Sequence, residues 1–150
     1  MKTFIAILAL TTSSMALAAT SATLQLKGTV QQLLDISIQA EGAATNLNLT
    51  QNAANLKVAT LTEKSNSSTG YKVTVSSQNQ GKLKNGNAQF SYTIGYNNQQ
   101  LTLTSPQTQS YSAGAYNVQR DVTISYTGQA QENLVAGDYT DTLTFSIAAN

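Results

Sequence analysis

Acid–base chemistry in this sequence would have to come from carboxylates, because its 150 residues include seven Asp and Glu but no His and no Cys. Without an imidazole or a thiol, the chain has no Ser-His-Asp or Cys-His nucleophile and no soft-metal cluster. A glycosidase-type site needs two carboxylates that face each other across a cleft. The seven are scattered and mostly fall at turns or polar strand positions: Asp35, Glu41, Glu63, Asp121, Glu132, Asp138 and Asp141. We therefore expect solvated carboxylates, no catalytic residue, no cofactor and no enzyme activity.

Two further pairs of charged side chains lie close together in the sequence. Asp138 and Asp141 lie three residues apart around a turn, but the spacing of the known calcium loop is absent, so we expect a turn and no metal site. Arg120 and Asp121 are adjacent, which predicts an exposed ion pair at the start of a strand.

The tyrosines divide into two groups by position. Tyr111 and Tyr116 follow the only proline, Pro106, in a predicted loop, where aromatic side chains could form a carbohydrate platform. The others considered fall within or beside predicted strands, where we expect half-buried packing: Tyr92, Tyr96, Tyr126 and Tyr139.

The first residues, "MKTFIAILALTTSSMALA", have a lysine near the amino terminus, an apolar run and an Ala-Leu-Ala end. This pattern is typical of a secretory signal cleaved after Ala18, and the apolar run is shorter than the roughly 20 residues of a membrane span. Removing Lys2 from eight basic residues leaves seven, equal to the seven acidic ones, so we expect no electrostatic attraction to nucleic acid. The sequence predicts a signal peptide over residues 1–18 and an exported protein.

From residue 19 onward the dominant pattern is alternation of apolar and polar residues, rich in Val, Ile, Thr and Tyr. It predicts strands over residues 22–30, 33–40, 56–63, 71–77, 90–96, 99–104, 118–126 and 139–148, with a weaker one over 46–49. Asn85-Gly86 and Asn97-Asn98 tolerate positive φ and predict tight hairpins. Many short strands at this spacing favour an all-β antiparallel sandwich of immunoglobulin type with no helix.

Two stretches near the ends of the exported chain resemble subunits of bacterial pili assembled by the chaperone-usher pathway. "ATLQLKGTVQQLLDISI" is similar to the N-terminal extension and first strand of such pilins, and "LVAGDYTDTLTFSIAAN" is similar to their last strand. The absence of Cys and of a tyrosine next to the last residue points to the cysteine-free pilins. The "GDYTDTLTF" segment also resembles spore-coat U-like domains, which occur in the same secretion systems.

The resemblance implies an incomplete immunoglobulin-like β-sandwich over residues 33–150, lacking its last strand, with a donor-strand extension over residues 19–32. The implied donor residues are Ala22, Leu24, Leu26, Gly28 and Val30. The implied acceptor groove is formed by Leu34, Ile36, Ile38, Leu143, Phe145 and Ile147. A strand inserted between two sheet edges satisfies backbone groups on both sides, and this advantage does not depend on the resemblance.

The function implied is that of a structural subunit of a cell-surface fimbria that supports adhesion or biofilm formation. Its implied partners are identical or related pilins, a periplasmic chaperone, an outer-membrane usher and a host or surface receptor. With a single domain, a shaft subunit is favoured over a tip adhesin. The alternative is a secreted β-sandwich binding module, completed by its own extension and able to bind carbohydrate through Tyr111 and Tyr116.

Overall fold

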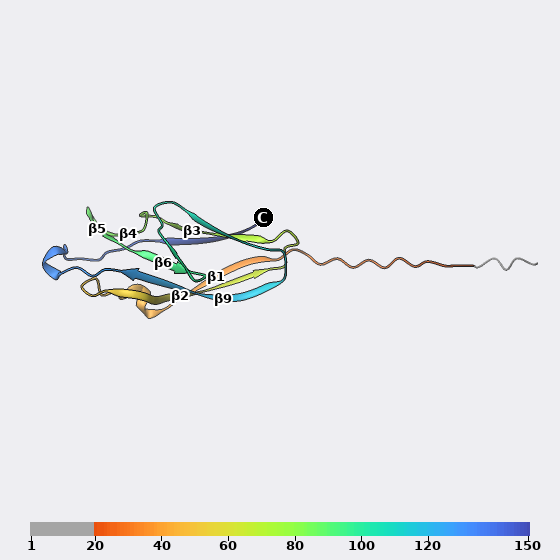
Figure 1. The fold of residues 1–150 in the computed structure, drawn as a ribbon, viewed down its shortest axis with the longest axis horizontal. Coiled ribbons are helices and arrows are strands. Elements are labelled where there is room, and N and C mark those ends of the chain that lie inside the picture. The colour runs from red at the N-terminus through yellow and green to blue at the C-terminus, as the bar shows by residue number, and fades with distance from the viewer. Residues whose placement is uncertain (1–19) are drawn as a thin grey trace, which may run out of the picture. The chain divides into compact units, whose positions relative to one another are not determined.

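The computed structural model describes residues 20–150 and is all-β, with antiparallel pairing throughout (Figure 1). The strands are β1 (Leu34–Ala40), β2 (Ala53–Ser65), β3 (Tyr71–Ser77), β4 (Lys82–Asn85), β5 (Ala88–Ser91), β6 (Thr93–Tyr96), β7 (Gln99–Leu101), β8 (Gln107–Tyr111), β9 (Tyr116–Tyr126) and β10 (Leu143–Ala149). The helical segments in this part of the chain are two short 3-10 turns, Gly42–Thr45 and Gln131–Asn133. Neither has the length to cross a membrane. The predicted signal peptide lies outside the described residues.

Residues 31–150 form one compact unit with two layers of strands. One sheet has the order β1-β2-β9-β6-β7, the other has the order β10-β3-β8, and β4 and β5 form a separate hairpin. Alternate side chains of each strand point into the space between the layers, as the period of two requires. The buried core therefore combines residues from both sheets, including Leu61, Tyr71, Val73, Ile94 and Val122. This architecture is that of a β-sandwich.

Two tight hairpins agree with the turn chemistry in the sequence. Asn97 and Asn98 have φ of 49° and 59° and join β6 to β7, as a type I′ turn requires. In the β4–β5 hairpin, Asn85 pairs with Ala88, so the two loop residues are Gly86 and Asn87. Only Gly86 has positive φ, which corresponds to a type II′ turn with glycine first. The predicted turn was therefore one residue too early.

Some predicted strands are wrong, for identifiable reasons. Residues 22–30 and 46–49 carry no strand, because alternation creates a strand only where a neighbouring edge accepts its backbone hydrogen bonds. The segment after Pro106, expected to be a loop, contains β8, whose mostly polar sequence "QTQSY" hides the period. The strand predicted over residues 90–96 is divided into the end of β5 and the whole of β6. The hairpin partner of β5, which is β4, was not predicted, because Leu83 is the single buried side chain of that strand.

The core contains a charged group at its centre. The side chain of Glu63 is fully buried and accepts hydrogen bonds from the hydroxyls of Tyr71, at 2.8 Å, and Tyr96. The Arg120 Nε donates to Glu63 Oε1 at 3.0 Å, and the Arg120 guanidinium lies over the Tyr111 ring, 4.8 Å from its centroid. We call Glu63, Tyr71, Tyr96, Tyr111 and Arg120 the buried polar cluster.

The expected exposed pair of Arg120 with Asp121 is wrong. Adjacent residues of a strand point to opposite faces of the sheet, so Arg120 turns inward to Glu63 while Asp121 turns outward to Lys57, 2.8 Å away. Glu63 itself was expected to be solvated, yet it follows the buried Leu61 in the inward phase of β2.

Replacement of the buried carboxylate tests the importance of this cluster. We expect Glu63→Ala to lower the free energy of unfolding by about 3 kcal/mol or more, because it leaves the mostly buried Arg120 guanidinium without a counter-ion. Chemical denaturation measures the change. The matched control is Lys57→Ala, which removes the exposed ion pairs with Asp121 and Glu41 and is expected to leave the free energy of unfolding close to that of the unmodified protein. Equal free energies of unfolding for the two variants would contradict the role of Glu63.

Candidate functional site

The first element of the candidate site is the open edge of β1. This strand pairs with β2 in a continuous register from Leu34–Ser65 to Ala40–Ala59, and no described strand pairs with its other side. The Glu41 N–H donates to Val58 O at 2.8 Å, which shows that the odd-numbered residues of this strand direct their backbone groups toward β2. In an antiparallel ladder, hydrogen-bonded pairs alternate with pairs that do not bond each other, so the even-numbered residues of β1 direct their backbone N–H and C=O groups away from β2. The outward set is Leu34, Ile36, Ile38 and Ala40.

The second element is the open edge of β10, the outer strand of the smaller sheet. It pairs with β3 from Leu143–Ser77 to Ala149–Tyr71, and nothing in residues 20–150 pairs with its other side. Gln78 N–H donates to Thr142 O and Asn150 N–H donates to Gly70 O, so the even-numbered residues face β3. The outward backbone groups are then those of Leu143, Phe145, Ile147 and Ala149.

The same residues present apolar side chains that the core covers only in part. Leu34, Ile36, Leu143, Phe145 and Ile147 are partly buried and pack against the core, while Ile38 is 54% exposed. All six predicted acceptor residues therefore lie on two edge strands, with unpaired backbone groups beside half-covered apolar surface.

The two edges lie close together without pairing, and we call the region between them the β1–β10 groove. Cα atoms of the two strands approach within 8 Å. A strand bonded to both would need them about 10 Å apart, which is twice the usual spacing of neighbouring strands. Seating such a strand therefore requires the two layers to separate locally, whereas a strand paired with β10 alone does not require it.

The buried polar cluster lies behind this groove. Ile36 pairs across the ladder with Glu63, and the Phe145 ring meets the Tyr96 ring edge-on with centroids 6.0 Å apart. Burial raises the pKa of Tyr71 and of Tyr96, and the negative charge of Glu63, which accepts a hydrogen bond from each hydroxyl, raises both further. The hydroxyls are thus held protonated as donors to Glu63.

The five predicted donor residues belong to the segment 20–30, which carries neither helix nor strand. The three large ones, Leu24, Leu26 and Val30, are 84%, 85% and 86% exposed. A Cβ built on Gly28 meets no atom within 4 Å. This segment therefore displays alternating apolar side chains to solvent, which is unusual for a chain that could bury them.

The predicted carbohydrate platform is not formed. Tyr111 stacks on the buried Tyr71 with ring centroids 4.6 Å apart, and Tyr116 meets the same ring edge-on at 5.1 Å. Both lie on strands, β8 and β9, and not in a loop. The error arose because the polar alternation around Tyr111 concealed β8. As expected, Tyr92, Tyr96 and Tyr126 are buried and Tyr139 is partly buried.

Asp141, one of the two acidic residues considered for calcium, is held by local hydrogen bonds. Asp141 accepts hydrogen bonds from Ser77 Oγ, the Asn79 N–H and the Tyr92 hydroxyl, and it ties the end of β3 to the segment before β10. Within residues 20–150, no three acidic side chains come together as a metal site would require.

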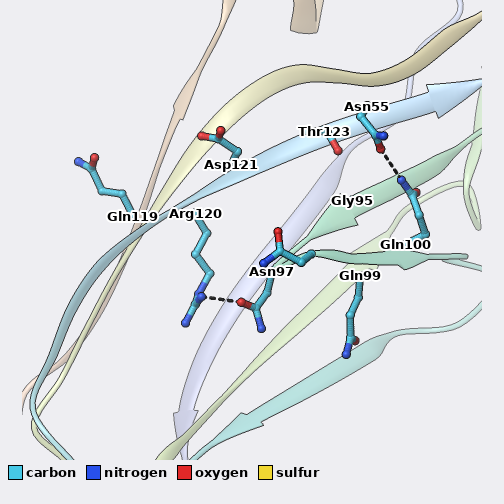
Figure 2. Close-up of a pocket in the computed structure, with 10 residues that line it drawn as sticks. Asn55, Gly95, Asn97, Gln99, Gln100, Gln119, Arg120, Asp121 and Thr123 are labelled. Carbon is cyan, nitrogen blue, oxygen red and sulfur yellow. Dashed lines mark hydrogen bonds between the residues drawn. The ribbon is translucent and has the colours of Figure 1, made fainter.

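A depression of about 680 Å³ lies on the outer face of the five-stranded sheet, near the β6–β7 turn (Figure 2). Amide side chains dominate its lining: Asn55, Asn97, Asn98, Gln99, Gln100 and Gln119. Several bond one another or their neighbours, as the dashed lines from Gln100 to Asn55 and from Arg120 to Asn97 show. These amides stabilise the turn, and the depression has no aromatic surface.

Alkaline titration tests the buried hydroxyls. Since the folded state raises the pKa of Tyr71, Tyr92 and Tyr96, their contribution to stability is complete below the unfolded value near pH 10 and is lost as the pH rises above it. We expect their phenolate absorbance to appear only together with loss of the β-sheet circular dichroism signal. Full ionisation of all seven tyrosines near pH 10 with unchanged circular dichroism would contradict this.

No protein-family model matches the chain, and no curated protein matches it either.

Proposed function

We propose that this protein is a structural subunit of a surface fibre and that it assembles by strand exchange, with residues 20–30 of one copy completing the β1–β10 groove of the next. The observation that carries the proposal is the coincidence of three features at two edges. Outward backbone groups, apolar side chains and the absence of a described partner strand all fall on the same residues of β1 and β10. Such an edge is the template that an added strand uses.

The strand order supports an immunoglobulin-like sandwich that lacks one strand. In constant-type immunoglobulin domains the sheets have the orders A-B-E-D and C-F-G. If β1, β2, β3, β6, β9 and β10 are taken as A, B, C, D, E and F, the observed order β1-β2-β9-β6 corresponds to A-B-E-D. The pair β3–β10 then corresponds to C-F, and the missing strand G belongs on the open edge of β10.

The energetics favour an arm from outside the domain as the missing strand. Burial of Leu24, Leu26 and Val30 contributes roughly 1.5 to 3 kcal/mol for each side chain before the cost of ordering the arm. Backbone hydrogen bonds to β10 add to this and remove an edge that would otherwise aggregate.

Repetition of this contact produces a fibre. The donor and the acceptor are different surfaces of the same chain, so the contact is heterologous, and a heterologous contact that does not close continues indefinitely. The resemblance to chaperone-usher pilins adds the rest of the proposal: export with a signal peptide, a periplasmic chaperone that holds the groove, an outer-membrane usher and a cell-surface location.

Addition of the arm as a peptide tests the proposal. We expect a peptide of residues 19–33 to raise the melting temperature of the compact unit 31–150, because it pairs with β10 and covers the apolar groove. A matched peptide with Leu24, Leu26 and Val30 changed to Ser controls for backbone pairing alone. A melting temperature that is the same with and without the arm peptide would refute strand exchange at this groove.

Gly28 provides a steric test. Since a Cβ on Gly28 meets no atom within 4 Å, we expect Gly28→Leu to leave the melting temperature of the subunit unchanged. The resemblance to chaperone-usher pilins implies that in the fibre this glycine lies where the acceptor's own side chains fill the groove, so we expect the leucine to block assembly. Electron microscopy and size-exclusion chromatography measure the fibres, and normal fibres from Gly28→Leu would disprove the steric account.

A further inference from the structure

Asn66, the residue after β2, holds the backbone that precedes β1. Its side-chain Oδ1 accepts from the Leu33 N–H at 2.6 Å, and its Nδ2 donates to Gln31 O at 2.8 Å. Its own backbone N–H donates to Leu33 O at 3.2 Å. One residue thus makes three hydrogen bonds to residues 31–33.

These bonds continue the β1–β2 ladder beyond its last paired residues. The register that pairs Leu34 with Ser65 would next pair Leu33 with Asn66, and the carboxamide of Asn66 supplies the acceptor for that pair. The bond to Gln31 O lies one alternate residue further along, on the same side. Residues 31–33 are therefore bound on the β2 side of the strand.

Without the Asn66 bonds, the three residues between the arm and β1 would be enough for a hairpin loop, and the arm could pair with β1 of its own domain. If residues 31–33 formed a three-residue hairpin loop, Val30 would lie opposite Leu34, Gly28 opposite Ile36 and Leu26 opposite Ile38. The even-numbered residues of β1 are those with outward backbone groups, so every pairing in this register would be satisfied.

That hairpin conflicts with the bonds of Asn66. In the loop, Gln31 would turn away from β2 and lose its bond to Nδ2, and Leu33 would leave the extended ladder conformation. The third residue of such a loop adopts a left-handed conformation, which a leucine resists.

We propose that Asn66 is a positioning residue that keeps residues 31–33 extended, so that the arm is withheld from the groove of its own subunit and remains available to a second copy of this chain. The inference rests on the proposed function, because it concerns which groove the arm enters. The Asn66 side chain bonds Gln31 and Leu33, which are neither donor nor acceptor residues, so its effect is on the choice between the two grooves.

Cross-linking within one chain measures the choice. The sequence has no cysteine, so Leu26→Cys with Ile38→Cys creates one possible disulfide within a chain, between residues that face each other in the same chain only when its arm folds back. The exported chain, residues 19–150, carries this pair with Asn66 unchanged, with Asn66→Ala or with Asn66→Asp, which keeps the acceptor for the Leu33 N–H. Oxidation at high dilution and non-reducing electrophoresis give the intramolecular fraction.

We expect Asn66→Ala to raise the rate of intramolecular cross-linking about tenfold, as the loss of two solvent-exposed hydrogen bonds implies, and Asn66→Asp to give a smaller increase. Leu33→Gly, which favours the loop without touching Asn66, is expected to raise it as well. The matched control is Asn85→Ala, at the end of β4, which also removes side-chain bonds to backbone carbonyls, those of Val135 and Ala136, and it is expected to have no effect.

Equal cross-linking with and without Asn66, or no cross-link in any variant, would overturn the inference. The peptide experiment separates this failure from that of the proposed function. If the arm peptide stabilises the unit 31–150 but Asn66→Ala cross-links no faster, strand exchange stands and only the role of Asn66 is wrong. If the peptide has no effect, the proposed function itself fails.

Discussion

The hydrogen-bonding groups of an edge strand have to be satisfied by something, and this constraint governs the molecule. In β1 and β10 the residues that direct backbone groups outward are also those with apolar side chains toward the core. Water can satisfy the backbone groups but leaves the apolar surface exposed. Only another strand satisfies both, since it brings donors, acceptors and a second row of side chains together. We infer that the open edges and the exposed apolar segment 20–30 are two parts of one assembly.

The proposed assembly requires the domain to remain folded while these edges are open, and because the sequence has no cysteine, no disulfide can contribute to this. The buried polar cluster is suited to this task. Glu63 is shared by Arg120 and two tyrosine hydroxyls, and these residues come from β2, β3, β6 and β9, so the cluster links both layers. A buried charge group contributes little net stability compared with an apolar core, but it strongly penalises any packing that leaves one of its members unpaired. We infer that the buried polar cluster keeps the two sheets in their relative alignment while the β1–β10 groove holds no added strand.

Much of the fold was accessible from alternation and turn residues. Alternation over residues 71–77 and 118–126 identified β3 and most of β9, because buried and exposed positions there differ clearly in residue type. The Asn97-Asn98 pair identified the β6–β7 hairpin, because asparagine tolerates positive φ. Alternation does not identify a strand where the side chains break that correspondence. β8 is almost wholly polar, and Glu63 and Arg120 are charged residues at inward positions whose burial depends on partners far apart in the sequence.

The sequence by itself determined that the chain is all-β, and it singled out the alternating residues from 22 to 38 and from 143 to 147, because period-two patterning is a local property of the chain. Only the tertiary structure decided which edges are left open, since an edge is defined by the strands that do not pair with it. It also decided that Tyr111 and Tyr116 belong to the core, that Arg120 turns to Glu63, and that Asn66 binds residues 31–33. Each of these contacts joins residues distant in sequence, and no local pattern encodes such a meeting.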